Sequence, residues 1–384
     1  MRRAVVTERP TPSVLLAVEQ LRRRVPGGIG AYARGLLGGL ALATTEGDGV
    51  DVALLASRAP GGSSDPLAAY DRPLHTSRLP SSLLTRAWDH GLSRAPAGFD
   101  IVHSVSLASP QIRRGSPERL VVTVHDVAWR RYPEATTRRG ARWHEAALRR
   151  ADRSGAALVV PSQLVAADLR EMGVADGRLT VVPSGADHLP APDPVATDAL
   201  LLRAGVSGEF LLTVSTLEPR KNVQRLVRAF GQVRNSLPGP WPLVVVGPIG
   251  WGPELADPPP ADHVIFTGPV PDAVLSELYR RARAFAYVPL TEGYGLPPLE
   301  AMHAGIPTVV SEEVPSVHDL GAPEPTAARV VDPLDVDDIA SGLAAVLTDT
   351  GLRSELARLG TAFAATRTWR ATARAHIDLW RSLR

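Results

Sequence analysis

The most informative part of this sequence reads Thr291-Glu292-Gly293-Tyr294-Gly295-Leu296-Pro297-Pro298-Leu299-Glu300-Ala301-Met302. The apolar run Ala284–Leu290 precedes it and predicts a buried strand. Gly293 and Gly295 allow a tight turn close to a ligand, and Pro297 suits the first position of a following helix. The amides at the start of that helix would point outward at the positive end of its dipole. This arrangement predicts a binding site for a phosphate group.

Two glutamates flank the predicted anion site. Glu292 precedes the helix and Glu300 lies in its first turn. Carboxylates do not bind an anion themselves, but they accept hydrogen bonds from hydroxyl groups. They therefore suit the hydroxyls on either side of the anion, as in two sugars joined through a diphosphate.

The glutamates stand eight positions apart (300 − 292 = 8), and the string Glu292–Glu300 resembles the signature of the retaining glycosyltransferases of family 4. Residues Ala301–Ser311 extend the likeness. The resemblance implies a GT-B fold, with two Rossmann-like domains facing across a cleft. It also implies that Glu292 and the backbone of Gly293, Tyr294, Gly295 and Leu296 contact the donor sugar, and that Glu300 binds the ribose.

Composition limits the other classes of function. The 384 residues include 44% hydrophobic and 21% charged residues, which is a globular composition long enough for two domains. The chain has no cysteine, so disulfides, thiolate metal sites and cysteine nucleophiles are excluded. A net charge of +2 gives no argument for nucleic acid. Residues Met1–Glu8 lack an apolar signal core, and no apolar run approaches the ~20 residues of a membrane span, so we expect a cytoplasmic protein.

Apolar runs alternate with helical patterns along the whole chain. The runs that predict buried strands are Val14–Val18, Val50–Ala56, Ile101–Val105, Leu120–Val124, Ala157–Val160, Leu179–Pro183, Phe210–Thr216, Leu243–Val246, Val264–Thr267, Ala284–Leu290 and Arg329–Asp332. The helical patterns are Ala31–Ala43, Arg138–Arg150, Gln163–Met172, Val223–Leu237, Ile339–Val346, Ser354–Ala364 and Thr368–Leu383. This alternation predicts an α/β protein with parallel, doubly wound sheets, whose ligand groups gather at the carboxyl ends of the strands.

The same pattern gives the expected domains. We expect an acceptor domain over 1–190, a nucleotide-sugar domain over 191–368, and a helix over 369–384 that crosses back to the first domain, as the resemblance implies. The proline-rich and acidic segment His188–Ala196 predicts the linker. The segment Ser57–Pro80 is rich in Gly, Pro and Ser and predicts a long, mobile connection.

Two strand ends of the first domain carry candidate site residues. Gly27 and Gly28 form a glycine turn before a helix, and in relatives such a loop lies near the donor diphosphate. His125 and Asp126 follow the strand Leu120–Val124. The resemblance implies that His125 touches the transferred sugar and that Asp126 orients His125 or meets the acceptor. Asp126 as a catalytic base stays open, since a carboxylate beside histidine can also only fix its tautomer.

The second domain carries the only lysine of the chain. Lys221 follows Arg220 at a strand-to-helix turn, where two cations would neutralise a diphosphate. The string resembles the Arg-Lys-Asn element of family 4, whose cations bind the leaving diphosphate. In relatives the turn at Gly268 and Val270 lines the nucleobase pocket. The acids Asp335–Asp338 open a helix, so we assign no metal.

These features predict a retaining, metal-independent hexosyltransferase without a cofactor, its co-substrate being a nucleotide-diphosphate sugar. The likeness of Glu292–Ser311 to mannosyltransferases favours GDP-mannose, with a UDP-hexose or a dTDP-deoxysugar as alternatives. The acceptor would be a hydroxyl of a glycan, a lipid-linked molecule or a small molecule. The sequence does not indicate an oligomeric state.

Three other functions are compatible with the architecture. A nucleotide-sugar epimerase would turn over donor without acceptor. A non-catalytic scaffold would bind the donor only, but intact Glu292, Glu300 and Lys221 argue against it. A phosphorylase with pyridoxal phosphate would need its lysine in another context. Separately, the arginines of 130–150 could meet a phosphorylated acceptor or an anionic inner membrane face, or form an ordinary solvated surface.

Overall fold

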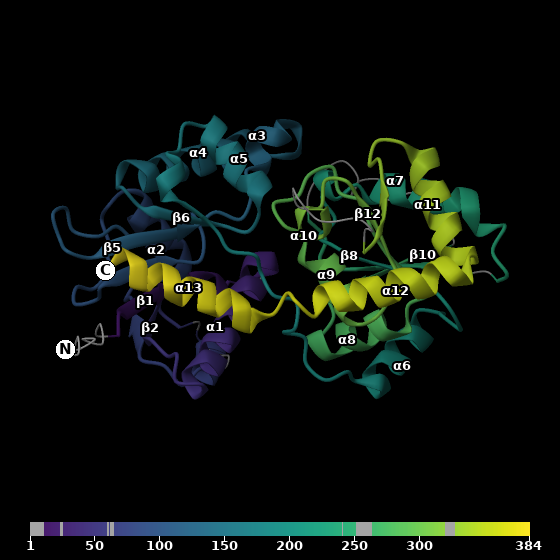
Figure 1. The fold of residues 1–384 in the computed structure, drawn as a ribbon, viewed down its shortest axis with the longest axis horizontal. Coiled ribbons are helices and arrows are strands. Elements are labelled where there is room, and N and C mark those ends of the chain that lie inside the picture. The colour runs from purple at the N-terminus through teal and green to yellow at the C-terminus, as the bar shows by residue number, and fades with distance from the viewer. Residues whose placement is uncertain are drawn as a thin grey trace, which may run out of the picture.

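The computed structural model describes residues 11–23, 26–59, 61, 65–239, 241–250, 263–318 and 327–384. The expectation about Met1–Glu8 falls outside these ranges. Figure 1 shows two bodies side by side, each with a central sheet covered by helices. We refer to residues 11–190 as the N-terminal half and to residues 191–368 as the C-terminal half.

The sheet of the N-terminal half is parallel and has the order β3-β2-β1-β4-β5-β6-β7. Its strands are β1 Ser13–Ala17, β2 Asp51–Ala56, β3 Leu74–Thr76, β4 Ile101–Ser104, β5 Arg119–Thr123, β6 Ala157–Val160 and β7 Leu179–Val181. The strand order reverses between β1 and β4, which places a ligand crevice outside their carboxyl ends.

The sheet of the C-terminal half repeats this plan with the order β10-β9-β8-β11-β12-β13, also parallel. Its strands are β8 Leu211–Val214, β9 Leu243–Val246, β10 Val264–Gly268, β11 Ala284–Tyr287, β12 Thr308–Ser311 and β13 Arg329–Val331. Here the order reverses between β8 and β11. The predicted α/β class with two Rossmann-like sheets is therefore confirmed.

Helices cover both faces of each sheet. In the N-terminal half they are α1 Gly27–Thr45, α2 Ser81–Asp89, α3 Ala128–Arg131, α4 Arg138–Arg153 and α5 Gln163–Glu171. In the C-terminal half they are α6 Pro194–Arg203, α7 Val223–Arg234, α8 Asp272–Arg281, α9 Leu296–His303, α10 Pro315–His318, α11 Val336–Thr348 and α12 Thr350–Ala364, and α13 Trp369–Leu383 ends the chain. Short 3-10 turns lie at η1 Glu19–Arg22, η2 Pro66–Ala69, η3 Pro133–Ala135, η4 Asp176–Arg178 and η5 Pro219–Lys221.

The segment Ser57–Pro80, expected to be a long, mobile connection, is in part regular structure. The segment contains η2 and the edge strand β3, which pairs with β2. Only one of the three β3 residues, Leu74, is large and apolar, and it is exposed, so no apolar run marks this strand. A buried Arg22 also forms an ion pair with Asp65, which holds the start of η2.

Three helix starts also differ from the predictions. The helix α1 begins at Gly27, four residues before Ala31. The helix α6 begins at Pro194 within the predicted linker, because Asp193 caps it by accepting a hydrogen bond from the Ala196 amide. In α9 Gly295 is the N-cap and Leu296 the first residue, so Pro297 is the second residue rather than the first.

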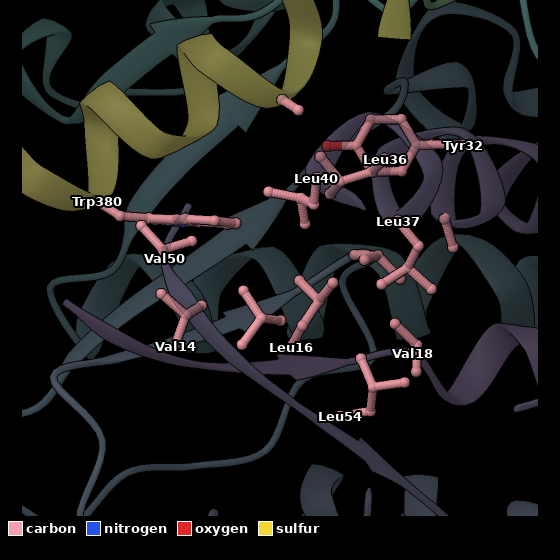
Figure 2. Close-up of a cluster of buried hydrophobic side chains, with 14 of the residues drawn as sticks. Val14, Leu16, Val18, Tyr32, Leu36, Leu37, Leu40, Val50, Leu54 and Trp380 are labelled. Carbon is pink, nitrogen blue, oxygen red and sulfur yellow. The ribbon is translucent and has the colours of Figure 1, made fainter. Parts of the chain in front are cut away.

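The helix α13 leaves α12 and packs on α1 of the N-terminal half, as Figure 1 shows in yellow. Figure 2 shows the core between them and the sheet, where Leu36 and Leu40 of α1 meet Leu16 of β1 and Trp380 of α13. Within the described ranges, no helix is both long enough and apolar enough to cross a bilayer.

Candidate active site

A cavity of about 390 Å³ lies between the two halves, at the carboxyl ends of both sheets. It brings together ten residues that the sequence singled out, although they come from four segments of the chain. These residues are Gly28, His125, Asp126, Arg220, Lys221, Glu292, Gly293, Tyr294, Gly295 and Leu296.

Four predicted residues do not line this cavity. Gly27 is the first residue of α1 and has a φ of 59°. Gly268 ends β10, and Val270 packs partly buried against the core of the C-terminal half. Glu300 is buried in α9, with 6% of its surface exposed. The structure thus separates the residues predicted for nucleobase and ribose from the cavity itself.

The cavity also has lining residues that sequence analysis missed. Ser215 follows β8, Gly247 follows β9, and Tyr287 is the last residue of β11. Their common signal is their place at the carboxyl end of a predicted strand. Tyr287 escaped notice because an aromatic residue inside an apolar run is expected in the core.

Glu292 lies at the centre of a charged cluster. Its Oε1 accepts hydrogen bonds from Arg220 Nη1 at 3.1 Å and from the Tyr287 hydroxyl at 2.7 Å, and it forms an ion pair with Lys221 Nζ. Lys221 Nζ also donates to the Tyr287 hydroxyl, and Arg220 Nε binds Glu218 at 2.7 Å. The two predicted diphosphate cations are thus held next to the predicted sugar-binding carboxylate.

Electrostatics keeps Glu292 and Arg220 ionised, whereas burial and the charge of Arg220 lower the pKa of Lys221 against the opposing effect of Glu292. Burial alone would raise the pKa of Glu292, but the charges of Lys221 and Arg220, with hydrogen bonds from Lys221 and Tyr287, lower that pKa to about 2. Burial would lower the pKa of Arg220, but the charges of Glu292 and Asp126 raise it above its ordinary value. Glu292 is therefore a carboxylate at neutral pH and can accept hydrogen bonds but not donate one.

Asn222 fixes the turn that carries the two cations. Among the described residues it is the non-glycine residue with a left-handed backbone, at a φ of 58°. Its buried side chain donates to the carbonyls of Val288 at 2.9 Å and Pro333 at 2.8 Å. The Leu290 amide in turn donates to the Arg220 carbonyl at 2.7 Å. These bonds join the turn after β8 to the segment after β11 and so place Arg220 and Lys221 beside Glu292.

The loop Glu292–Gly295 contacts both halves of the molecule. Ser162 Oγ donates to the Gly293 carbonyl at 2.7 Å, and the Tyr294 hydroxyl donates to the Ser184 carbonyl at 2.8 Å. A Cβ on Gly293 would overlap the carbonyl oxygen of His125, so only glycine fits there. Gly295 has a φ of 94° and opens α9, whose first two residues, Leu296 and Pro297, line the cavity. The positive end of this helix therefore faces the cavity.

Glu300 is bound by protein groups on both of its oxygens. The Tyr279 hydroxyl donates to Oε2 at 2.9 Å, and His188 Nε2 lies 3.4 Å from Oε1. His188 belongs to the segment that joins the two halves, and its Nδ1 accepts from Trp369 Nε1 at 3.1 Å. Glu300 thus contacts the linker and, through it, the start of α13.

His125 has a defined protonation state. Its Nε2 lies 2.8 Å from the Val105 carbonyl, and because a carbonyl only accepts, Nε2 carries the proton. Burial lowers the pKa of His125, against opposing contributions from Val105 and Asp126. The ring is therefore neutral near pH 7, and Nδ1 keeps a lone pair that can accept a hydrogen bond from a hydroxyl.

Asp126 does not orient His125 through a hydrogen bond. Its Oδ1 accepts from the Ala128 amide at 3.1 Å, at the start of α3, whereas the Val105 carbonyl fixes the tautomer of His125. The alternative that Asp126 sets this tautomer was wrong. Asp126 nevertheless lines the cavity and lies close enough to Arg220 to raise its pKa.

The acids Asp335–Asp338 are used within the protein. Asp335 caps α11 by accepting from the amides of Asp337 and Asp338, and Asp338 accepts from the Asp332 amide. Across the described ranges, no group of three or more His, Asp or Glu side chains is arranged to hold a metal ion.

Two Rossmann-like sheets with a charged cavity between their carboxyl ends define a GT-B glycosyltransferase. Family models agree with this class. Residues 26–188 match the model "Glycosyltransferase Family 4", and residues 204–362 match the model "Glycosyl transferases group 1". The chain belongs to the group 1 glycosyltransferases of the family 4 type.

Individual relatives are similar at modest identity. The O-antigen chain mannosyltransferase B of Escherichia coli is 29% identical over 261 residues, which are 66% of this chain and 67% of that protein. A GDP-mannose-dependent alpha-(1-6)-phosphatidylinositol monomannoside mannosyltransferase of Mycolicibacterium smegmatis is 28% identical over 273 residues, 65% of this chain and 66% of that protein. A serotype-specific mannosyltransferase WbdA of E. coli is 32% identical over 179 residues, which are 44% of this chain but 21% of WbdA.

Solved structures share the fold. The Anabaena protein HepE, in complex with UDP and glucose, superposes with a TM-score of 0.70 at 17% identity and covers 97% of this chain and 100% of its own.

Proposed function

We propose that this protein is a retaining hexosyltransferase that moves a sugar from a nucleotide diphosphate to a hydroxyl group, without a metal ion. The observation that carries the proposal is the convergence of Arg220, Lys221 and the start of α9 on one cavity that also contains Glu292 and His125. Two cations and a helix N-terminus can neutralise a diphosphate leaving group. The Glu292 carboxylate, the Tyr287 phenol and the neutral His125 imidazole beside them can hold sugar hydroxyls.

The proposed reaction breaks the bond between the anomeric carbon and the diphosphate oxygen and forms a bond from that carbon to the acceptor oxygen on the same face. The acceptor proton passes to the departing phosphate oxygen, so no separate base is required. Arg220 and Lys221 stabilise the charge that develops on the phosphate. Glu292 is ionised and lies where it can stabilise the positive charge that develops on the sugar ring. Asp126 accepts a hydrogen bond from the Ala128 amide and needs no proton-transfer role.

The proposed donor is GDP-mannose. Both the E. coli and the M. smegmatis relatives carry mannosyltransferase names, and the second name includes GDP-mannose. The acceptor hydroxyl reaches the anomeric carbon from the N-terminal half, where His125 and Asp126 line the cavity.

A thermal-shift series with GDP, UDP, dTDP and their hexose conjugates tests the donor site. A nucleotide at ~100 times its dissociation constant adds about 2.7 kcal/mol of stability, which is easily seen. We expect GDP and GDP-mannose to stabilise the wild type and not Lys221→Ala. Arg228→Ala removes an exposed arginine of α7 away from the cavity and is the matched control. An equal shift in Lys221→Ala and the wild type would contradict the site.

Turnover separates transfer from its alternatives. Incubation with GDP-mannose and a saccharide mixture should release GDP and give a product of retained anomeric configuration by NMR. Interconversion of the donor sugar without acceptor would instead identify an epimerase. Binding without any turnover would identify a scaffold.

A further inference from the structure

A second cavity of about 380 Å³ lies within the N-terminal half. It shares three lining residues with the donor cavity, namely Ile29, His125 and Asp126. The two cavities therefore meet beside the groups proposed to contact the transferred sugar. A ligand in the second cavity would therefore lie next to the position from which an acceptor hydroxyl approaches the transferred sugar.

One side of this second cavity is aromatic. Trp129, Trp143 and His144 line it, with Trp129 stacked on His144 at 4.8 Å and 17°, and Trp143 edge-on to His144 at 4.8 Å and 83°. Trp129 Nε1 donates to Glu145 at 3.3 Å, and Trp143 Nε1 donates to Asp89 at 2.8 Å. Both indole N–H groups are thus bound within the protein, which orients the rings. Trp129 is buried, whereas the half-buried Trp143 and His144 keep ring surface for a ligand.

The rest of the lining combines apolar and polar groups and carries little positive charge. Gln20, Thr85 and Ser106 offer amide and hydroxyl groups, and Arg23 is the exposed arginine at the rim. The amide and hydroxyl groups exchange hydrogen bonds with hydroxyls but do not neutralise a phosphate.

Four arginines of the region 130–150 form ion pairs with carboxylates. Arg130 and Arg149 bind Glu145, Arg150 binds Asp89, and Arg131 binds Asp168 and Glu313. Two of these carboxylates, Glu145 and Asp89, also hold the indoles of the aromatic wall, and no arginine of 130–150 is in the described lining of this cavity. Among the described residues, the lining of this cavity offers a phosphorylated acceptor a single arginine, Arg23.

Building on the proposed transfer reaction, we propose that this second cavity binds the acceptor as a neutral pyranose, with the sugar ring against Trp143 and His144 and a hydroxyl directed to His125 and Asp126. The C–H face of a pyranose carries partial positive charge and packs well on the negative face of an aromatic ring. The neutral His125, with its lone pair on Nδ1, accepts a hydrogen bond from the acceptor or the transferred sugar.

The test compares a methyl hexoside with the phosphate ester of the same hexose as acceptors. We expect transfer to the methyl hexoside, with a KM at least about tenfold higher in Trp143→Ala, since a stacked aromatic contributes roughly that factor. Trp143→Phe keeps a ring and should recover most of the loss. Arg142→Ala removes an exposed arginine of α4 and should change neither acceptor, which makes it the matched control.

The nucleotide-induced thermal shift, measured on every variant, reports an intact donor site and fold. Wild type that binds nucleotide but prefers the phosphate ester, with a loss in Arg142→Ala, would overturn the neutral-sugar assignment alone. An unchanged KM in Trp143→Ala would overturn it as well. Wild type that neither binds a nucleotide nor transfers would instead overturn the proposed function.

Discussion

One carboxylate oxygen, Glu292 Oε1, accepts from Arg220, Lys221 and Tyr287 together. Because of these shared contacts, binding of the diphosphate affects the position of Glu292, the carboxylate proposed to bind the sugar. A diphosphate that attracts Arg220 and Lys221 must compete with Glu292 for them. A bound donor would therefore weaken the ion pairs of Glu292 with Arg220 and Lys221. The hydroxyls of the donor sugar would then donate hydrogen bonds to the same carboxylate.

The pairing of Glu292 with two cations makes its charge important for stability. Its pKa is about 2 in the folded protein against 4.5 when unpaired, so the pairing contributes fully above pH 4.5 and is lost as the pH falls toward 2. Glu292→Gln removes the carboxylate partner of Lys221 and leaves Arg220 paired with Glu218, and it should lower the free energy of unfolding at pH 7 by on the order of 3 kcal/mol. Urea denaturation at several pH values measures both effects.

The matched control for this prediction is Glu355→Gln, which removes a carboxylate from an exposed pair with Arg358 on α12. Its urea midpoint should stay near that of the wild type. A Glu292→Gln protein with the same midpoint and the same acid dependence as the wild type would contradict the ionised cluster.

At this scale the sequence predicted the members of the cluster better than their contacts. Arg220, Lys221 and Glu292 were named from strand ends and from the resemblance, and all three line the cavity. The roles of Tyr287 and Asn222 were not predicted. Tyr287 bonds to Lys221 and Asn222 bonds to Val288, and each pair is separated by 66 residues in the chain. Side-chain pairing over such distances depends on the assembled fold.

The helix pair α1 and α13 shows how glycines set the spacing of elements. A Cβ on Gly35 would overlap the indole of Trp369, and one on Gly39 would overlap the Trp369 carbonyl oxygen. Gly38, between them, is exposed and has no atom near its absent Cβ. The small residues therefore lie on the face of α1 that α13 covers.

This geometry predicts opposite effects from neighbouring substitutions. Gly35→Ala should destabilise the protein by about 2 kcal/mol, because Trp369 must move. Gly38→Ala should stabilise it by up to about 1 kcal/mol, because alanine favours a helix more than glycine does. Thermal unfolding of the two variants against the wild type measures the difference. Equal melting temperatures for the two variants would show that α13 does not pack on α1 in this way.

Most strands with an apolar run were predicted, and most elements without one were not. The limits of β9 agree with the prediction at both ends, whereas β3, β12, α2, α3, α6, α8 and α10 were not predicted. The strand β3 lacks an apolar run, and α6 begins with the proline and acid that also mark linkers. Local patterns report burial on one face, so elements at the edge of a sheet or on its surface leave a weaker signal.

At the scale of the whole molecule, side chains and backbone tie the two halves together around the cavity. Ser162 donates a hydrogen bond to the Gly293 carbonyl, and Tyr294 donates one to the Ser184 carbonyl. Arg131 also forms an ion pair with Glu313 at 3.2 Å. The helix α13 adds a buried network under the site. His376 Nδ1 donates to the Thr372 carbonyl at 2.8 Å, so its Nε2 accepts from the Tyr32 hydroxyl at 2.8 Å. None of this network follows from sequence patterns, since a histidine in an amphipathic helix looks like a surface residue.

Tyr32 joins that network to the candidate active site. Its ring packs edge-on against His125 at 4.7 Å, and it lines the donor cavity. The neutral state of His376 therefore supports both the docking of α13 and the position of His125.

The burial of His376 predicts that mild acid weakens the docking of α13. Burial lowers the pKa of His376 from 6.5 to about 4, against a smaller opposing effect of the Thr372 carbonyl. Between these values the unfolded chain binds a proton that the folded protein does not, so stability is complete above pH 6.5 and falls as the pH drops toward 4. The loss from this residue is on the order of 3 kcal/mol.

His376→Gln keeps a polar side chain without titrating, so its unfolding free energy should fall less steeply over this range than that of the wild type. His90→Gln removes an exposed histidine and should keep the wild-type slope. Urea denaturation from pH 4 to 7.5 measures all three slopes, and a wild-type slope in His376→Gln would mean that His376 is already protonated, or is not buried, in the folded protein.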